Sequence, residues 1–180
     1  TNDGQGGFRR RALGPEGNGV NVRLGDVDAD GNLDALFSNL SGPRNQLFRG
    51  DGLGGFVADA GFPGSDPAYD GDFFDADGDG DLDVFLLRIG SPNGDNADGP
   101  EQLWLNDGRG GFVDASARVP FSRSDVHDHD MDHGDLDGDG REDVVIVVDN
   151  ISPNFRTARS RILFNRGARG FERVDSPLAD

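Results

Sequence analysis

The sequence predicts an all-β fold: a β-propeller segment of about three four-stranded antiparallel blades. Three observations support this prediction. A unit of roughly 50–60 residues recurs along the chain. Each unit holds four short strand-like stretches and shows no helical periodicity. Each unit also carries one acidic loop of the form D-x-D-x-D-G-x-x-D at the same place.

Two sets of landmarks define the repeat. The first aspartates of the acidic loops, Asp26, Asp75 and Asp135, are 49 and 60 residues apart. A Gly-Phe pair recurs in step with them, and its phenylalanines are 48, 56 and 59 residues apart. These phenylalanines are Phe8, Phe56, Phe112 and Phe171. The chain, residues 1–180, is therefore interpreted as a single partial β-propeller, with blades at 18–59, 65–116 and 125–175 and the tail of a preceding blade at 1–12.

The elements follow the same order in every unit. An alternating stretch such as 20–24 or 69–73 predicts the first strand, and the acidic loop follows it. A short apolar run rich in β-branched and aromatic residues then predicts the second strand. The predicted third strands are 46–49, 102–105 and 161–164. A Gly-rich turn such as 106–111 reverses the chain into the fourth strand, because Asn, Asp and Gly tolerate positive φ.

Three blades are too few to close a ring, since propellers usually have at least four. An open arc would expose sheet edges and apolar blade faces. We therefore expect the missing blades to come from a longer chain or from copies of this one. The start of the sequence in mid-unit favours the longer chain.

Composition restricts the classes of partner. The chain has 34 acidic and 17 basic residues, for a formal charge of −17, which disfavours nucleic acid and anionic membrane surfaces. No apolar run approaches the length of a membrane span, so no membrane insertion is expected. Cysteine is absent, so disulfides cannot stabilise the fold. Cations are the expected partners.

The acidic loop has the chemistry of a calcium site. Carboxylates at positions 1, 3 and 5 point into a tight loop, the Gly at position 6 permits the bend, position 7 offers a backbone carbonyl, and the Asp at position 9 closes the shell. Strands flank the loop and the Glu at position 12 is missing, so it is not an EF-hand. The predicted ligands are Asp26, Asp28, Asp30, Asn32 and Asp34 in the first loop, Asp75, Asp77, Asp79, Asp81 and Asp83 in the second, and Asp135, Asp137, Asp139, Arg141 and Asp143 in the third.

An all-oxygen anionic shell selects hard cations, and a flexible loop favours Ca²⁺ over the strictly octahedral Mg²⁺. The sequence therefore predicts about three Ca²⁺ ions. Solvated acidic turns are the alternative, which three loops in register disfavour.

These units resemble FG-GAP/VCBS repeats, the blades of integrin α-subunit propellers and of many bacterial extracellular proteins. The residues that carry the resemblance are 25–37, 74–85, 102–114 and 134–146, and the match covers essentially the whole chain. It implies calcium bound between the first two strands of each blade. It also implies a role in adhesion, ligand recognition, including lectin activity, or scaffolding.

The first strand of the third unit reads VHDHDMDHGD (126–135). Strand alternation places His127, His129 and His133 on one face, where they could share a transition metal such as Zn²⁺ or Cu²⁺. Packing of these imidazoles at a blade interface or in a wet channel is the alternative, and the one we favour.

The sequence thus predicts a non-catalytic, secreted or cell-surface protein of bacterial type, with a protein or glycan as its ligand. No nucleophile elbow, phosphate loop or Ser/His/Asp spacing is present. The alternatives are a lectin, or part of a larger enzyme or redox protein with its metal on the histidine strand. The tripeptide Arg49-Gly50-Asp51 is explained by turn chemistry, because Leu105-Asn106-Asp107 fills the same place in the next unit.

Overall fold

The structure is a computed structural model that describes residues 4–7, 19–40, 44–64, 67–88, 101–120, 128–148 and 160–175. These residues form three four-stranded antiparallel sheets, with strands paired in chain order within each sheet. The first sheet contains β1 (Gly19–Gly25), β2 (Asp34–Asn39), β3 (Gln46–Gly50) and β4 (Phe56–Ala58). The middle sheet contains β5 (Ala68–Phe74), β6 (Asp83–Arg88), β7 (Gln102–Asn106) and β8 (Phe112–Asp114). The third contains β9 (Asp128–Gly134), β10 (Asp143–Val148), β11 (Arg161–Asn165) and β12 (Phe171–Asp175).

This architecture confirms the predicted all-β fold and the four-strand order of each unit. The only helical elements in the described ranges are two 3₁₀ turns, η1 (Ser116–Arg118) and η2 (Gly167–Arg169). The fourth strands begin at the Gly-Phe landmarks, at Phe56, Phe112 and Phe171, as expected. None of the helices in these ranges has the length and apolar character needed to cross a membrane.

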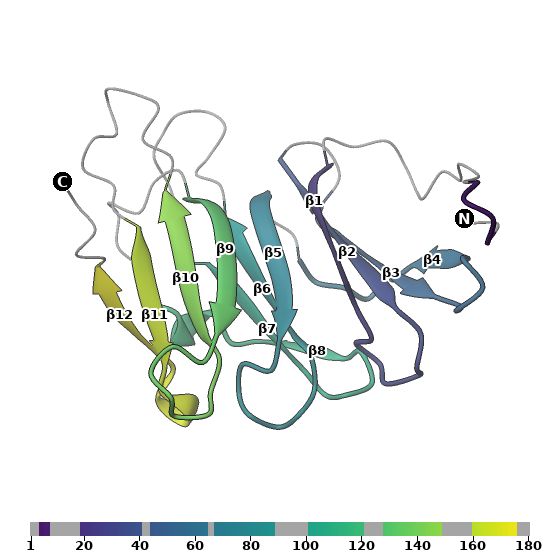
Figure 1. Ribbon diagram of the computed structural model, residues 1–180. Helices are drawn as coiled ribbons and strands as arrows, with labels where there is room; N and C mark the ends of the chain where they lie inside the picture. The colour runs from purple at the N-terminus through teal and green to yellow at the C-terminus, as the bar shows by residue number, and fades with distance from the viewer. Residues whose placement is uncertain are drawn as a thin grey trace.

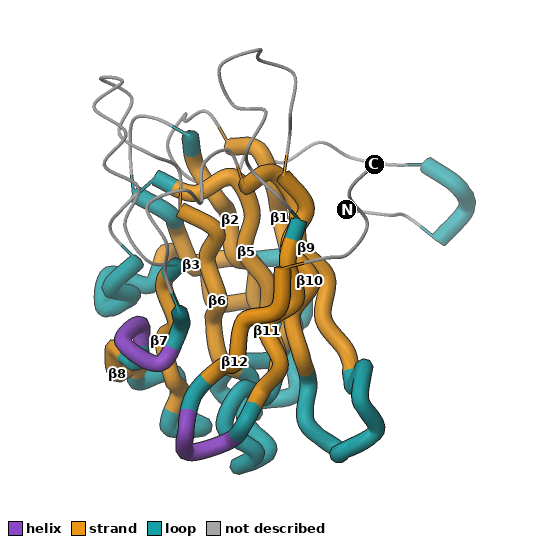
Figure 2. The backbone as a smooth tube through the Cα atoms, turned by 90° about the vertical axis from the view of Figure 1, so that its left-hand side faces the viewer, coloured by secondary structure: helices purple, strands orange, loops and turns teal. Residues whose placement is uncertain are grey.

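The sheets stand next to one another with their first strands as neighbours. Strand β5 contacts β1 on one side and β9 on the other, an arrangement visible in Figure 1. Figure 2, turned by 90°, shows the same upright course of the strands with connecting loops at their lower ends. The acidic loops join β1 to β2, β5 to β6 and β9 to β10, so they lie at the same end of the strands in all three sheets.

Two apolar cores fill the spaces between sheets. Strand β6 is buried on both faces, which explains why its sequence is a continuous apolar run. Val84 and Leu86 face the first sheet, whereas Phe85 and Leu87 face the third. Each such side chain, when fully buried, contributes about 1.5–3 kcal/mol of transfer free energy. The middle sheet therefore depends on neighbours on both sides.

Polar contacts align the three first strands. Arg23 in β1 donates to Asp72 in β5 at 2.8 Å and to Asp70 at 3.3 Å. Asp70 also accepts the backbone N–H of Met131 in β9 at 3.1 Å, so one buried carboxylate connects all three sheets. Burial, followed by a hydrogen bond with Asp130, raises the pKa of Asp70 to about 6.

A buried ion-pair triad joins the middle and third sheets. Arg161 in β11 binds both carboxylate oxygens of Asp128 at 2.6 Å and reaches Glu101, just before β7, at 2.7 Å. All three side chains are buried. Burial, and then the negative charge of Asp128, raises the pKa of Glu101. Nothing in the periodicity of the sequence indicates this triad, because its members lie up to 60 residues apart.

Candidate metal centres

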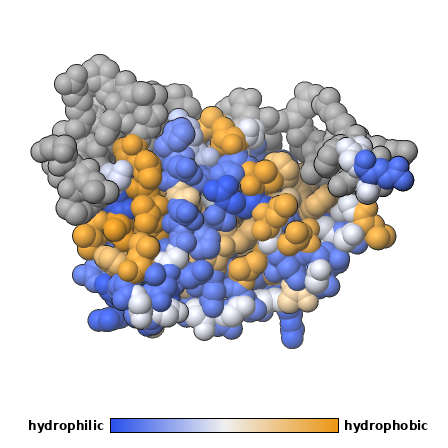
Figure 3. Space-filling view, in the orientation of Figure 1, coloured by the Kyte–Doolittle hydropathy of each residue, from blue (hydrophilic) through white to orange (hydrophobic). Residues whose placement is uncertain are grey.

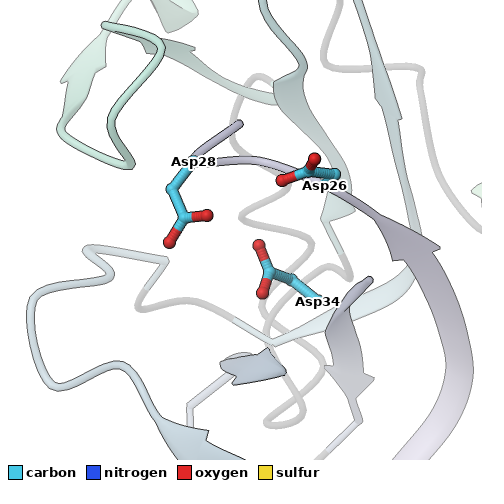
Figure 4. A group of neighbouring side chains, drawn as sticks. All are labelled: Asp26, Asp28 and Asp34. Carbon is cyan, nitrogen blue, oxygen red and sulfur yellow. The ribbon is translucent and has the colours of Figure 1, made fainter. Parts of the chain in front are cut away.

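Three carboxylates converge in each acidic loop. In every loop, the residues at positions 1, 3 and 9 offer oxygens that all lie within 4.8 Å of one another. Figure 4 shows the first group turned toward a common space. The groups are Asp26, Asp28 and Asp34; Asp75, Asp77 and Asp83; and Asp135, Asp137 and Asp143. Three groups of metal-ligand geometry are therefore present, one in each sheet.

The carboxylate at position 1 also shapes the loop. In the middle sheet, one oxygen of Asp75 accepts the N–H groups of Gly78 at 2.7 Å and Asp79 at 3.1 Å. The other accepts from Gly80 at 3.0 Å. Gly78 and Gly80 have φ of 86° and 95°, a region that costs other residues about 1–2 kcal/mol. The two glycines thus let the backbone turn its N–H groups onto Asp75.

The Asp at position 9 is a buried brace as well as a cluster member. Asp83 accepts the N–H of Ala76, at loop position 2, and that of Asn106, at the end of β7, both at 2.8 Å. Asp34 and Asp143 accept the equivalent pairs of N–H groups in their sheets. The sequence predicted this Asp as a ligand but not as the acceptor of these two backbone N–H groups. Its position at the start of the second strand was the one feature of the sequence that could have indicated the second role.

Positions 5 and 7 lie outside the three-carboxylate groups. Asp30, Asp79 and Asp139 each accept the N–H of the residue two positions on, at 2.8, 3.0 and 3.0 Å. These bonds form the second turn of each loop. The carbonyls of Asn32, Asp81 and Arg141 remain predicted ligands.

The charge of the clusters fits a divalent cation. Burial, and then the charges of Asp34 and Asp30, raises the pKa of Asp28. Burial and Asp79 raise the pKa of Asp77 in the same way, and burial raises that of Asp83 to about 6. One oxygen of Asp28 is buried and accepts no hydrogen bond. Carboxylates that repel one another, one of them buried in each cluster, and a buried oxygen of Asp28 without a donor are the features a bound hard cation would satisfy.

Arginines make the three clusters unequal. Arg49 lies 3.3 Å from Asp34 and 3.7 Å from Asp28 in the first loop. Arg166 binds Asp137 in the third loop at 2.6 Å and lowers the pKa of that carboxyl, chiefly through the hydrogen bond. In the same loop Arg141 pairs with Asp139. Across the described segments, no arginine forms an ion pair with Asp75, Asp77 or Asp83 in the middle loop.

The two described histidines of β9 lie on different aromatic rings. His133 stacks on Phe74 with ring centroids 5.0 Å apart, and its Nδ1 lies 3.4 Å from Glu142. His129 lies 5.7 Å from the ring of Tyr69. Neither belongs to a group of metal-ligand geometry within the ranges described, and His127 lies outside them. The ring contacts agree with the packing alternative, and the transition-metal site remains a prediction.

The Arg49-Gly50-Asp51 tripeptide has both charged side chains engaged within the fold. Arg49 donates to Asp59 at 2.7 Å. Asp51 accepts the N–H groups of Leu53 at 2.8 Å and Gly55 at 2.7 Å and so closes the hairpin. Turn formation therefore accounts for this motif.

Without metal, the protein is expected to lose stability as the pH rises from about 4 to 7. The pKa values of Asp70 and Asp83 are raised from 3.8 to about 6 in the fold. An acid with a higher pKa in the folded state contributes stability that is complete below its unfolded pKa and is lost as the pH rises through its folded pKa. A shift of one pKa unit between the unfolded and folded states corresponds to about 1.4 kcal/mol in the free energy of unfolding. Thermal unfolding of EDTA-treated protein between pH 4.5 and 7.5 measures this trend, and a melting temperature that rises steadily across that range would contradict it.

The carboxylate clusters and the sheet arrangement are the features from which a function can be inferred. No protein-family model matches the chain, and no curated protein shows significant similarity to it. The function therefore has to be inferred from the chemistry of the loops and the packing of the sheets.

Proposed function

We propose that this chain is a calcium-stabilised β-propeller segment of the FG-GAP/VCBS type, with a non-catalytic role in adhesion, ligand recognition or structural assembly outside the cell. The observation that carries the proposal is the recurrence of the same three-carboxylate cluster at the same edge of three successive sheets. Side-by-side packing of the first strands supports the propeller, whose blades surround an axis with their first strands innermost.

Calcium is the ion that the donors favour. Each cluster presents carboxylate oxygens alone, and Ca²⁺ takes six to eight oxygens in flexible geometry. When bound, the ion would supply positive charge that offsets the repulsion within the loop. Asp26, Asp28 and Asp34 would hold it in the first sheet, and the equivalent residues in the other two. Weak calcium modules are typical of the extracellular space, where the ion is at millimolar concentration.

The residues of the loop link the ion to the sheet. The position-9 carboxylate braces the loop to the end of the third strand, as Asp83 does between Ala76 and Asn106. The position-1 carboxylate holds the N–H groups of the turn. Charge neutralisation at these two residues would therefore stabilise strand ends and loop together, in a chain that has no cysteine.

Calcium titration of metal-free protein tests the proposal. We expect about three ions to bind by isothermal calorimetry and the melting temperature to rise with calcium concentration. A ligand at about 100 times its dissociation constant stabilises the folded state by about 2.7 kcal/mol per site. The triple variant Asp28→Asn/Asp77→Asn/Asp137→Asn, which removes one carboxylate from each cluster, should lose most of this gain.

The control is the variant Asp132→Asn/Asp175→Asn, which neutralises two exposed carboxylates outside the clusters. It should keep the number of bound ions and the calcium-dependent rise in melting temperature. Absence of binding at 10 mM calcium, with unchanged melting, would refute the proposal.

A further inference from the structure

An asparagine bridge recurs at both interfaces between sheets. Asn106, the last residue of β7, donates its side-chain N–H to the carbonyl of Val27 in the first sheet at 2.6 Å. Asn165, the last residue of β11, donates in the same way to Ala76 in the middle sheet at 2.8 Å. Both asparagines are buried. The middle and third sheets thus each bind position 2 of the acidic loop in the preceding sheet.

The acceptor sheet presents the same apolar face at both interfaces. The side chain at loop position 2 is buried, and so is a cross-strand pair between the second and third strands. The pair is Leu36 and Leu47 in the first sheet and Phe85 and Leu103 in the middle sheet. A sheet that follows another one covers this face.

The third sheet carries the same face but leaves it exposed. Its loop position 2 is Leu136, whose exposed fraction is 51%, against 1% for Val27. Val147 is 48% exposed, whereas Leu87 at the equivalent place in β6 is 0% exposed. Val145 and Ile162 form the equivalent cross-strand pair and are less completely buried than Phe85 and Leu103. Figure 3 shows apolar side chains gathered over this sheet, at the left of the view.

We propose that this face, formed by Leu136, Val145, Val147 and Ile162, docks one further four-stranded unit of the same repeat, with an asparagine at the end of its third strand. That asparagine donates to the Leu136 carbonyl, as Asn106 and Asn165 do to their acceptors. The inference rests on the proposed propeller. It adds which face accepts the next unit and which residue the incoming unit must carry.

A second copy of this chain does not meet that requirement. At the end of β3 the first sheet has Gly50, which stands in the register of Asn106 and Asn165. A Cβ atom there would overlap the carbonyl oxygen of Leu33, so no side chain fits without a backbone shift. The first sheet therefore cannot supply the bridge, and the other two asparagines already have their acceptors within the chain.

A tandem extension of the chain tests the docking. Residues 61–120 are appended directly after Asp175, which follows Phe171 by four residues as Ala60 follows Phe56. Because the chain has no cysteine, Val147→Cys is a clean probe of the face. Thiol labelling of V147C should be at least about tenfold slower in the extended chain, while L53C at the exposed hairpin tip should label equally in both.

A matched variant identifies the bridge. Asn106→Ala placed only in the appended copy should raise the labelling rate of V147C about tenfold. This factor corresponds to a docking free energy weakened by about 1.4 kcal/mol through loss of the hydrogen bond. An appended unit that folds, adding β signal in circular dichroism, but leaves V147C labelling unchanged would overturn the proposal. So would an appended unit that adds no β structure, since the face would then not support it.

Self-association is the competing outcome. If labelling of V147C in the unextended chain slows between 1 and 200 μM protein, a second copy covers the face and the commitment to a further repeat unit is wrong. Calcium titration of the unextended and extended chains keeps the two proposals separate. The appended residues carry a further acidic loop, so about three ions should bind to the unextended chain and about four to the extended one. These ion counts without protection of V147C in the extended chain would retain the calcium sites and reject the docking.

Discussion

Replacement of Arg161 by leucine is expected to lower the free energy of unfolding by about 3–5 kcal/mol, because it leaves Asp128 and Glu101 buried without a counter-charge. Both carboxylates are bound by this one guanidinium, with N–O distances of 2.6–2.7 Å. The triad connects the middle and third sheets, so the loss should appear as weaker packing between these sheets.

Urea unfolding of Arg161→Leu measures the effect, with Arg173→Leu as the control. Arg173 pairs with the exposed Asp175, and an exposed pair of this kind contributes about 0–1 kcal/mol. The triple variant Arg161→Met/Asp128→Leu/Glu101→Met should recover most of the lost stability, since an apolar replacement leaves no buried charge. A loss below 1 kcal/mol for Arg161→Leu would show that water reaches the triad.

The middle loop is expected to bind calcium most tightly of the three. Its cluster of Asp75, Asp77 and Asp83 forms no ion pair with an arginine among the pairs of the described ranges, whereas Arg49 and Arg166 approach the clusters of the first and third loops. A guanidinium already paired with a ligand carboxylate must be displaced or repelled when a cation binds. Asp77→Asn should therefore remove the highest-affinity step of a calcium titration.

In the third loop, a substitution is expected to raise calcium affinity. Arg166→Gln frees Asp137 and should raise calcium affinity there by about tenfold, which corresponds to about 1.4 kcal/mol for one charged hydrogen bond. Arg169→Gln changes the charge by the same amount three residues further on and is the control. Competition calorimetry with a chromophoric chelator resolves the sites. Equal affinities in all variants would show that the arginines do not act on the ions.

The sequence predicted the strands and the loop carboxylates because both follow local periodicity. Alternation and the Gly-Phe landmarks located β1, β5 and the fourth strands, and the D-x-D-x-D-G-x-x-D pattern predicted Asp26, Asp28 and Asp34 as neighbours. The carboxylate at position 5 accepts the N–H two residues on, a local turn that competes for the oxygen, and its role as a metal ligand remains a prediction.

Contacts between distant segments were beyond reach from the sequence. Asp70 looks like one exposed carboxylate among many in the acidic sequence, yet it is buried between β1 and β9. Asn106 follows the pattern of a hairpin turn, and its hydrogen bond to Val27 spans 79 residues. Such pairings depend on how the sheets pack, and the pattern of residues within a single strand or turn carries no information about them.

The asparagine bridges also have a direction. Each donor lies in a later sheet and each acceptor carbonyl in an earlier one, with Asn106 reaching back to Val27 and Asn165 to Ala76. A chain that emerges from the ribosome therefore meets a finished acceptor whenever a new asparagine appears. The units can therefore pack in order from the N-terminus, each sheet binding the preceding sheet before the next one is synthesised.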